Sequence, residues 1–283
     1  MPCLDEAATL ALCIKKAVQC FEENGIDGEV VVADNNSTDE SAAIARKQGA
    51  RVVFAPVPGY GSALMTGIAA ARGKYIIMGD ADDSYDFSRL MDFIRELRQG
   101  NDLVLGSRFR GGIEQGAMPP LHRYFGNPLL TRLAKLFFNC STSDIYCGMR
   151  GFTRAAYDKM HLLSTGMEFA VEMVIKGKLL GLQCTEIPTT LSKDGRGRAP
   201  HLRSWRDGWR TLRFMLLFSP RIVFLYPGLL LMLVGMIATG LLLGDTVQIS
   251  HVGFDVQTLL YAVAAVIIGY QGVLTYRLAT KYT

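Results

Sequence analysis

Short apolar runs alternate with helical patterns through the first half of this sequence, and no other feature constrains the fold as strongly. Runs rich in β-branched and other apolar residues predict buried strands at 29–34, 51–55, 75–78 and 102–106. Helices are predicted between them, at 10–21, 37–48, 62–71 and 87–98. This alternation is typical of an α/β domain in which helices cover both faces of a mostly parallel sheet. Such domains bind ligands at the carboxyl ends of their strands.

The amino-terminal residues fit this pattern less well. A sheet-based domain usually has a strand ahead of its first helix, but here MPCLDEAATL leads directly into the helical pattern. We therefore expect either that the chain begins farther upstream or that the sheet lacks this strand. The second helix is predicted to begin in a capping box formed by Ser37 and Glu40.

The strand predicted at 75–78 ends in Gly79 and three carboxylates, Asp80, Asp82 and Asp83. Clustered carboxylates repel one another unless a cation compensates them, and hard oxygen ligands suit Mg²⁺ or Mn²⁺. Asp34 ends the strand at 29–34 and is expected at the same edge of the sheet. The alternative for the acidic cluster alone is a solvated turn.

Familiar phosphate-binding and hydrolase motifs are not present. Gly59-Tyr60-Gly61 begins a G-x-G, but Leu64 stands where the dinucleotide fingerprint needs glycine. The stretch 67–74 is one residue too long for a P-loop, and no G-x-S-x-G occurs.

An arginine-rich stretch follows the strand predicted at 102–106. Arg108, Arg110 and Arg123 lie among glycines, prolines and aromatic residues, and guanidinium groups in such a loop can hold an anion. An ordinary charged surface loop is the alternative.

A helix predicted near 168–180 carries Glu168 and Glu172 four residues apart, and therefore on one face. Glutamates at this spacing are more often solvated than catalytic. The residues next to them in the sequence are apolar, which favours at least one of the two glutamates pointing into the active site.

Two uncharged apolar segments, 222–243 and 256–276, are each long enough to cross about 30 Å of hydrocarbon as a helix. The loop between them contains no Lys or Arg, whereas basic residues flank the pair, so the positive-inside rule predicts a hairpin with both chain ends cytoplasmic. The alternative is a pair of buried core helices.

A basic amphipathic stretch precedes the first apolar segment. Trp205 and Trp209 are four residues apart and alternate with arginines, which suits a helix lying at lipid headgroups. Because these arginines adjoin a predicted span, lipid rather than nucleic acid is the expected partner. The six cysteines form no C-x-x-C pair, which favours reduced, mostly buried thiols in a cytosolic setting.

Together these motifs resemble the inverting family 2 glycosyltransferases of the GT-A fold, specifically the branch similar to dolichol-phosphate mannosyltransferase. The resemblance covers the whole chain and rests on the order of its motifs: PCLDE, VVVADNNSTDES, GYGSALMTG, MGDADDS, GSRF, DIYCGMR, MEFAVEM, a basic loop and two carboxyl-terminal spans. It implies a Rossmann-like catalytic domain at 1–200, an interface helix at 201–220 and a transmembrane hairpin at 221–279.

The resemblance also assigns roles to residues. Those bordering the nucleotide base and ribose would be Pro2, Leu4, Glu6 and Asp34. Asp80 and Asp82 would hold the metal and donor diphosphate, and Arg108 and Arg123 the acceptor phosphate. Further substrate-binding candidates are Asn36, Gly61, Arg150 and Arg196. The catalytic candidates are Asp82, Arg108, Glu168 and Glu172.

Three features depart from the family pattern: the missing first strand, Asp5 in place of the usual Asn, and Asp83 where many relatives carry Leu or Gly. The first puts the completeness of the base pocket in question. The other two could tune which nucleotide is accepted.

The expected reaction moves a sugar, with inversion, from a nucleotide sugar to an undecaprenyl or dolichyl phosphate, using Mg²⁺ or Mn²⁺. UDP is weakly favoured over GDP as the nucleotide of the donor. The sequence does not decide whether the protein forms a homo-oligomer. An alternative is transfer to a lipid alcohol, which would need Glu168 or Glu172 as general base. A catalytically idle membrane scaffold is disfavoured by the intact acidic and arginine motifs.

Overall fold

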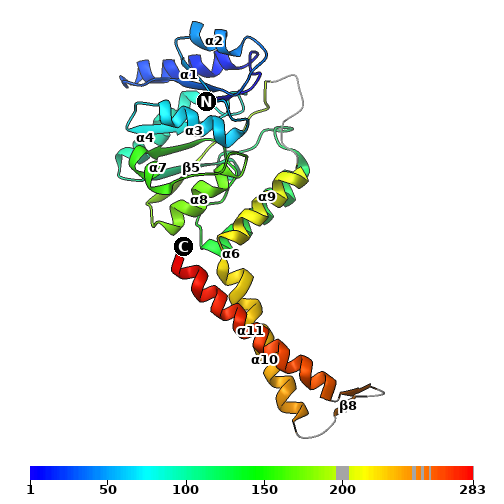
Figure 1. Cartoon of the computed structure of the whole chain (residues 1–283). Helices are drawn as coiled ribbons and strands as arrows, with labels where there is room; N and C mark the ends of the chain where they lie inside the picture. Colours follow the sequence, from blue (N-terminus) through cyan, green and yellow to red (C-terminus); the bar gives the residue numbers. More distant parts are fainter. Residues whose placement is uncertain (196–203, 244–246, 250–251, 255, 283) are drawn as a thin grey trace. The chain divides into compact units, whose positions relative to one another are not determined.

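The computed structural model describes residues 1–195, 204–243, 247–249, 252–254 and 256–282 (Figure 1). The chain forms two compact units, Met1–Leu212 and Arg213–Thr283. The first contains the alternating strands and helices, and the second contains the two long apolar helices. Arg196 lies outside the described residues, so its expected contact with substrate stays a prediction.

The strands of the first unit form two ladders. They are β1 (Pro2–Cys3), β2 (Val31–Asp34), β3 (Arg51–Phe54), β4 (Tyr75–Met78), β5 (Leu103–Ser107), β6 (Arg150–Thr153) and β7 (Cys184–Pro188). The first ladder has the order β1-β2-β3 and is parallel throughout. The second has the order β4-β6-β5-β7, in which β5 and β7 are parallel and β6 runs antiparallel to both of its neighbours. The α/β prediction with a mostly parallel sheet is confirmed.

The helices of this unit pack in separate groups. They are α1 (Leu10–Glu23), α2 (Ser41–Lys47), α3 (Tyr60–Ala70), the short helix η1 (Phe87–Arg89), α4 (Leu90–Arg98), α5 (Arg108–Gly111), the π-helical turn η2 (His122–Gly126), α6 (Asn127–Phe138), α7 (Arg154–Met160) and α8 (Phe169–Leu179). Helix α1 contacts α4, whereas α3 contacts α8. On the α4 side, Phe93 and Leu97 are buried against Gly151 of β6, and each such side chain stabilises the fold by about 1.5–3 kcal/mol.

The expectation that no strand precedes the first helix is wrong. Pro2 and Cys3 pair in parallel with Ala33 and Asp34, and the backbone N–H of Ala33 donates to Met1 O at 2.9 Å. The strand was missed because two residues are too few to show a period in sequence.

The capping-box prediction is also wrong. Helix α2 begins at Ser41, and its N-cap residue, Glu40, makes no side-chain capping bond. The Ser37 hydroxyl instead accepts a hydrogen bond from the backbone N–H of Asp5 at 3.0 Å, and Asp39 Oδ1 accepts from Ser41 N at 2.9 Å. Tertiary contact with the amino-terminal loop displaces the local motif.

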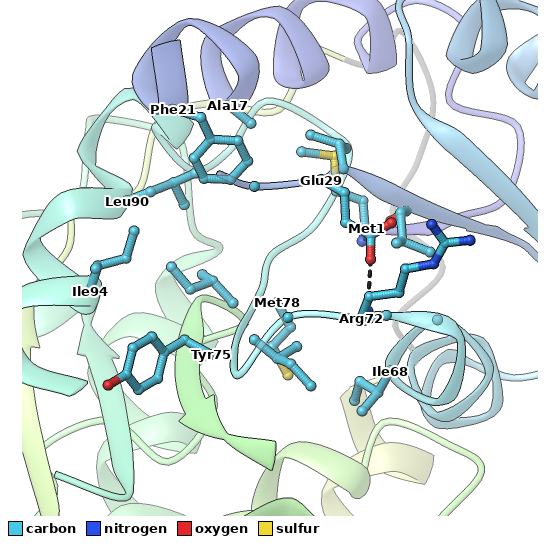
Figure 2. Close-up of a pocket in the computed structure, with 18 of the residues that line it drawn as sticks. Met1, Ala17, Phe21, Glu29, Ile68, Arg72, Tyr75, Met78, Leu90 and Ile94 are labelled. Carbon is cyan, nitrogen blue, oxygen red and sulfur yellow. Dashed lines mark hydrogen bonds between the residues drawn. The ribbon is translucent and has the colours of Figure 1, made fainter. Parts of the chain in front are cut away.

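A cavity of about 690 Å³ is lined by residues of both ladders (Figure 2). Its lining includes Met1, Val31 of β2, Ile68 of α3 and Met78 of β4, together with charged residues such as Glu29 and Arg72. Met1 is half-buried in this region, and its amino-terminal ammonium donates to Val31 O at 2.9 Å. Burial lowers the pKa of this ammonium from its ordinary 8.0 to about 6.

For a chain prepared with its free amino terminus at Met1, this ammonium predicts a pH-dependent stability. The folded state disfavours the charged form of the Met1 ammonium, so the unfolded chain binds more protons between pH 8 and 6. The free energy of unfolding should therefore fall as the pH is lowered through this range. The expected loss is up to about 2 kcal/mol. It can be measured by urea denaturation of the detergent-solubilised chain at a series of pH values.

The matched control carries a four-residue extension of alternating Val and Ser in front of Met1, which moves the ammonium away from Val31. The extended chain should be the more stable one at pH 6 and should lose the dependence between pH 8 and 6. An unchanged dependence in the extended chain would contradict the assignment to the Met1 ammonium.

The second unit contains a close helical pair. Its elements are η3 (Arg221–Leu225), α10 (Tyr226–Leu242), β8 (Val247–Ile249), β9 (Val252–Phe254) and α11 (Val256–Tyr282); α9 (Ser204–Leu217) continues into it from the first unit. The helical stretches Arg221–Leu242 and Val256–Lys281 have mean hydropathies of 2.2 and 1.7 and are long and apolar enough to cross a membrane. Between them, β8 and β9 pair as an antiparallel hairpin.

Glycines let the backbones of α10 and α11 approach closely. A Cβ placed at Gly269 would lie 2.5 Å from Gly228 O, and one placed at Gly228 would lie 2.7 Å from Gly269 O. Small residues at such contacts are the usual device of helix pairs in lipid, where apolar burial supplies no drive for association.

Gly269→Ala is therefore expected to loosen this hairpin and to lower the melting temperature in detergent by several degrees. Gly240→Ala is the matched control, because a Cβ there meets nothing within 4 Å. Equal melting temperatures of the two variants would show that the contact at Gly269 does not hold the pair together.

Candidate active site

The acidic turn after β4 is held by hydroxyl groups. Asp80 Oδ1 accepts a hydrogen bond from Tyr60 Oη at 2.8 Å. Asp82 is buried, and its Oδ1 accepts from the backbone N–H of Ser84 at 3.1 Å and from Ser84 Oγ at 2.6 Å. Both carboxylates therefore have fixed orientations at the carboxyl end of β4.

The third carboxylate of the turn has a different partner. Asp83 Oδ1 accepts from Lys16 Nζ of α1 at 2.7 Å, and its backbone adopts a left-handed conformation with φ of 60°. The side chain thus forms an ion pair with α1 and is compensated without a metal.

A second loop forms a wall beside Asp80. The backbone N–H of Gly148 donates to Tyr85 Oη at 2.9 Å, and a Cβ at Gly148 would lie 2.5 Å from Asp80 Oδ2. Burial raises the pKa of Tyr85 well above its ordinary value, the Arg108 guanidinium opposes this rise, and the Asp80 carboxylate adds to it. Arg108 and Asp80 therefore both act electrostatically on Tyr85.

Arg108 forms a buried two-bond ion pair with Asp144. Its Nε and Nη2 atoms donate to the two carboxylate oxygens at 2.7 and 2.8 Å, and its backbone N–H donates to Asp144 Oδ2 at 3.2 Å. Asp144 is 0% exposed and Arg108 is 9% exposed. Motif order alone pointed to Arg108, but only the structure shows that Asp144 fixes its position.

Near Arg108, η2 carries His122 and Arg123. Burial lowers the pKa of His122, and the charge of Arg108 lowers it further. Arg123 is half-buried, lies over the ring of Tyr124 at 5.6 Å, and has a long contact of 3.5 Å between Nη1 and Ile113 O.

The strand ends of the first ladder form the other part of the site. Asp34 is buried, and its Oδ1 has no hydrogen-bond partner among the described residues. Leaving such an atom unpaired costs free energy unless a ligand supplies a donor. Of the other candidates in this region, Glu6 is buried, Pro2 and Leu4 are half-buried, and Asn36 has a left-handed backbone with φ of 70°.

Arg150 is placed differently from its predicted role. It is 0% exposed, and its guanidinium donates to the carbonyl oxygens of Ile145, Cys147 and Ala170. This geometry ties the loop before β6 to α8 and does not support the prediction that Arg150 contacts substrate.

Glu172, a candidate general base, is also held by protein groups. It is 1% exposed, accepts from the backbone N–H groups of Leu163 and Ser164, and pairs with Lys176 at 2.7 Å. Burial opposes these donors, but together they hold the pKa of Glu172 below its ordinary value, which makes it a poor base. Glu168, the other candidate, is half-buried beside Gly166.

Among the residues that the structure describes, Asp80 and Asp82 are the candidates for binding a metal ion in the acidic turn. Among the described residues, no group of three or more His, Cys, Asp and Glu side chains is arranged to hold a metal ion. Asp80 and Asp82 nevertheless supply hard oxygen donors of the kind that Mg²⁺ and Mn²⁺ prefer, and the hydrogen bonds from Tyr60 and Ser84 orient these two carboxylates. Asp80 and Asp82 fit an ion whose remaining coordination positions would be filled by phosphate oxygens and water.

All six cysteines are free and five are buried, as predicted.

The fold and the acidic strand end together define a GT-A glycosyltransferase domain. Residues 1–160 match the family described as Glycosyl transferase family 2. The chain belongs to this family, which confirms the resemblance noted in the sequence.

Two relatives from Haloferax volcanii are informative. The chain is 41% identical over 259 residues to the low-salt glycan biosynthesis hexosyltransferase Agl6, covering 91% of this chain and 62% of Agl6. It is 34% identical over 161 residues to a dolichyl-phosphate hexose transferase, covering 56% of this chain and 68% of that relative. The chain therefore spans less than two thirds of the length of Agl6.

Among solved structures, the chain resembles glucosyl-3-phosphoglycerate synthase from Mycobacterium tuberculosis in complex with Mn²⁺, UDP and glucosyl-3-phosphoglycerate. The TM-score is 0.61 at 22% identity, and the match covers 77% of each chain. This likeness establishes the shared fold.

Proposed function

We propose that this protein transfers a sugar from a nucleotide sugar, with UDP favoured over GDP, to a polyprenyl phosphate at the cytoplasmic face of a membrane. The observation that carries the proposal is that one loop, 144–148, contacts both the acidic strand end and a buried arginine. Gly148 of this loop lies against Asp80, and Asp144 of the same loop pairs with Arg108.

On the donor side, the unpartnered Oδ1 of Asp34 is suited to accept a hydrogen bond from a ribose hydroxyl or base N–H. Asp80 and Asp82 would hold the divalent ion that binds the donor diphosphate. When bound, the ion neutralises charge that develops on the leaving nucleoside diphosphate. The Mn²⁺ and UDP in the structurally similar mycobacterial synthase support this assignment.

On the acceptor side, a lipid phosphate is already ionised at neutral pH. It therefore needs groups that orient it more than it needs a general base to remove a proton. One phosphate oxygen would attack the anomeric carbon from the face opposite the diphosphate, forming a new C–O bond as the bond to the diphosphate breaks. Arg108, which Asp144 fixes in position, and Arg123 would orient the phosphate. The configuration at the anomeric carbon would invert.

A lipid alcohol is the competing acceptor. It would require removal of a proton, and Glu172 is poorly suited because three donors hold its carboxylate. The dolichyl-phosphate hexose transferase among the relatives also supports a phosphate acceptor.

Membrane attachment by the two apolar helices brings the site to a lipid acceptor. We place both chain ends in the cytoplasm because Arg213, Arg221, Arg277 and Lys281 flank the hairpin, whereas its connecting loop has no Lys or Arg. The exposed Trp205 and Trp209 of α9 fit the headgroup region. The bounds 1–200, 201–220 and 221–279 stay predictions.

A transfer assay tests the proposal. The purified full chain is supplied with Mn²⁺ or Mg²⁺, labelled UDP- and GDP-sugars, and either undecaprenyl or dolichyl phosphate or diacylglycerol. Acid-labile label in the polyprenyl fraction is expected. Label only in the diacylglycerol fraction would overturn the phosphate acceptor and would return the role of base to Glu168.

A further inference from the structure

Tyr60 contacts one of the two proposed metal-binding carboxylates. It is the first residue of α3, and its hydroxyl donates to Asp80 Oδ1 at 2.8 Å. This hydrogen bond restrains the rotation of the Asp80 carboxylate.

The start of α3 is held on both sides by polar contacts. The backbone N–H of Gly59 donates to Asn35 Oδ1 at 2.8 Å, and the backbone N–H of Ser62 donates to Thr165 O at 3.1 Å. Tyr60 therefore sits between two fixed backbone positions.

The glycines on either side of Tyr60 permit this arrangement. Gly59 has φ of 138°, and a Cβ at Gly59 or Gly61 would collide with backbone carbonyl oxygens of Thr165 or Ser164. The loop 163–166 can thus press directly on the α3 backbone only because both positions lack a side chain.

Glu172 fixes the loop that presses on α3. Its carboxylate accepts from the backbone N–H groups of Leu163 and Ser164 at 3.1 and 2.8 Å. A continuous set of contacts therefore leads from Glu172 through Ser164 and Thr165 to the backbone around Tyr60, and from the Tyr60 hydroxyl to Asp80.

We propose that Tyr60 is a positioning residue that orients the Asp80 carboxylate toward the metal and donor diphosphate, and that Glu172 sets the position of Tyr60. This inference rests on the proposed function. Partners that orient a metal-binding carboxylate typically contribute about 10- to 100-fold to metal affinity. The inference also gives the buried Glu172 carboxylate a role, which is to hold the loop 163–166 against α3.

The test measures Mn²⁺ binding to the full-length protein in the presence of UDP by electron paramagnetic resonance, so it requires no acceptor. Tyr60→Phe removes only the hydroxyl and is expected to weaken Mn²⁺ binding by at least about 10-fold. Its melting temperature should stay within a few degrees of wild type. Tyr75→Phe is the matched control, since Tyr75 lines the cavity shown in Figure 2, and it should bind Mn²⁺ as wild type does.

Gly61→Ala provides a second route to the same result, because the added methyl group must displace α3 from the loop 163–166. Folded Gly61→Ala protein should also bind Mn²⁺ more weakly. Wild-type affinity in Tyr60→Phe would overturn the inference while leaving the proposed function standing. If wild type binds no Mn²⁺ with either UDP or GDP, the inference fails, and the proposed function is then decided separately by the transfer assay with Mg²⁺.

Discussion

Asp82→Asn is expected to lower sugar transfer by about 100- to 1000-fold, the range found when one preorganised electrostatic contact to a developing charge is removed. The substitution keeps the shape of the side chain and an oxygen that can accept from Ser84, but it removes the negative charge. The loss should therefore appear in turnover and in the metal concentration required, with the melting temperature nearly unchanged.

The matched control is Asp83→Asn in the same turn. Asp83 pairs with Lys16 at a partly exposed position, and such pairs contribute about 0–1 kcal/mol to stability. Asparagine also tolerates the left-handed backbone at this position. Transfer by Asp83→Asn should remain within a few-fold of wild type, and equal losses in the two variants would show that the general charge of the turn matters and not a specific ligand.

The second large effect is expected for Asp144→Asn. Removing the charge leaves the Arg108 guanidinium buried without its ionic partner, and breaking a buried pair in this way typically costs about 3–5 kcal/mol. For a unit of this size, that corresponds to a fall in melting temperature of about 10 °C. Scanning calorimetry of the full chain in detergent measures it.

Asp92→Asn is the control for this measurement. Asp92 pairs with Arg89 and Arg95 at the surface of α4, where all three side chains are partly exposed. The expected loss is below about 1 kcal/mol. If both variants lost equal stability, the ion pair of Arg108 would have to be much more hydrated than its burial indicates.

Local patterns in the sequence were sufficient for much of the fold. The run 75–78 was predicted as a strand with the bounds that the structure gives β4, because four apolar residues followed by glycine and carboxylates can be buried only up to that point. The two apolar helices were also evident, since helix length and hydropathy are local properties. The two-residue strand β1 and the start of α2 depended on contacts across about 30 residues, and no local signal could report them.

The sequence by itself determined the chemical inventory of the site: carboxylates after β4, arginines after β5 and an order of motifs that indicates the family. Only the tertiary structure decided which groups each charged residue contacts. Arg150 is of the same residue type as Arg108, and Glu172 carries a carboxylate as Asp82 does, yet Arg150 and Glu172 lie where backbone carbonyls and N–H groups surround them, and so they anchor loops. The physical reason is that a buried charge acts on whichever groups the fold places within hydrogen-bonding distance, and residue spacing along the chain does not specify those groups.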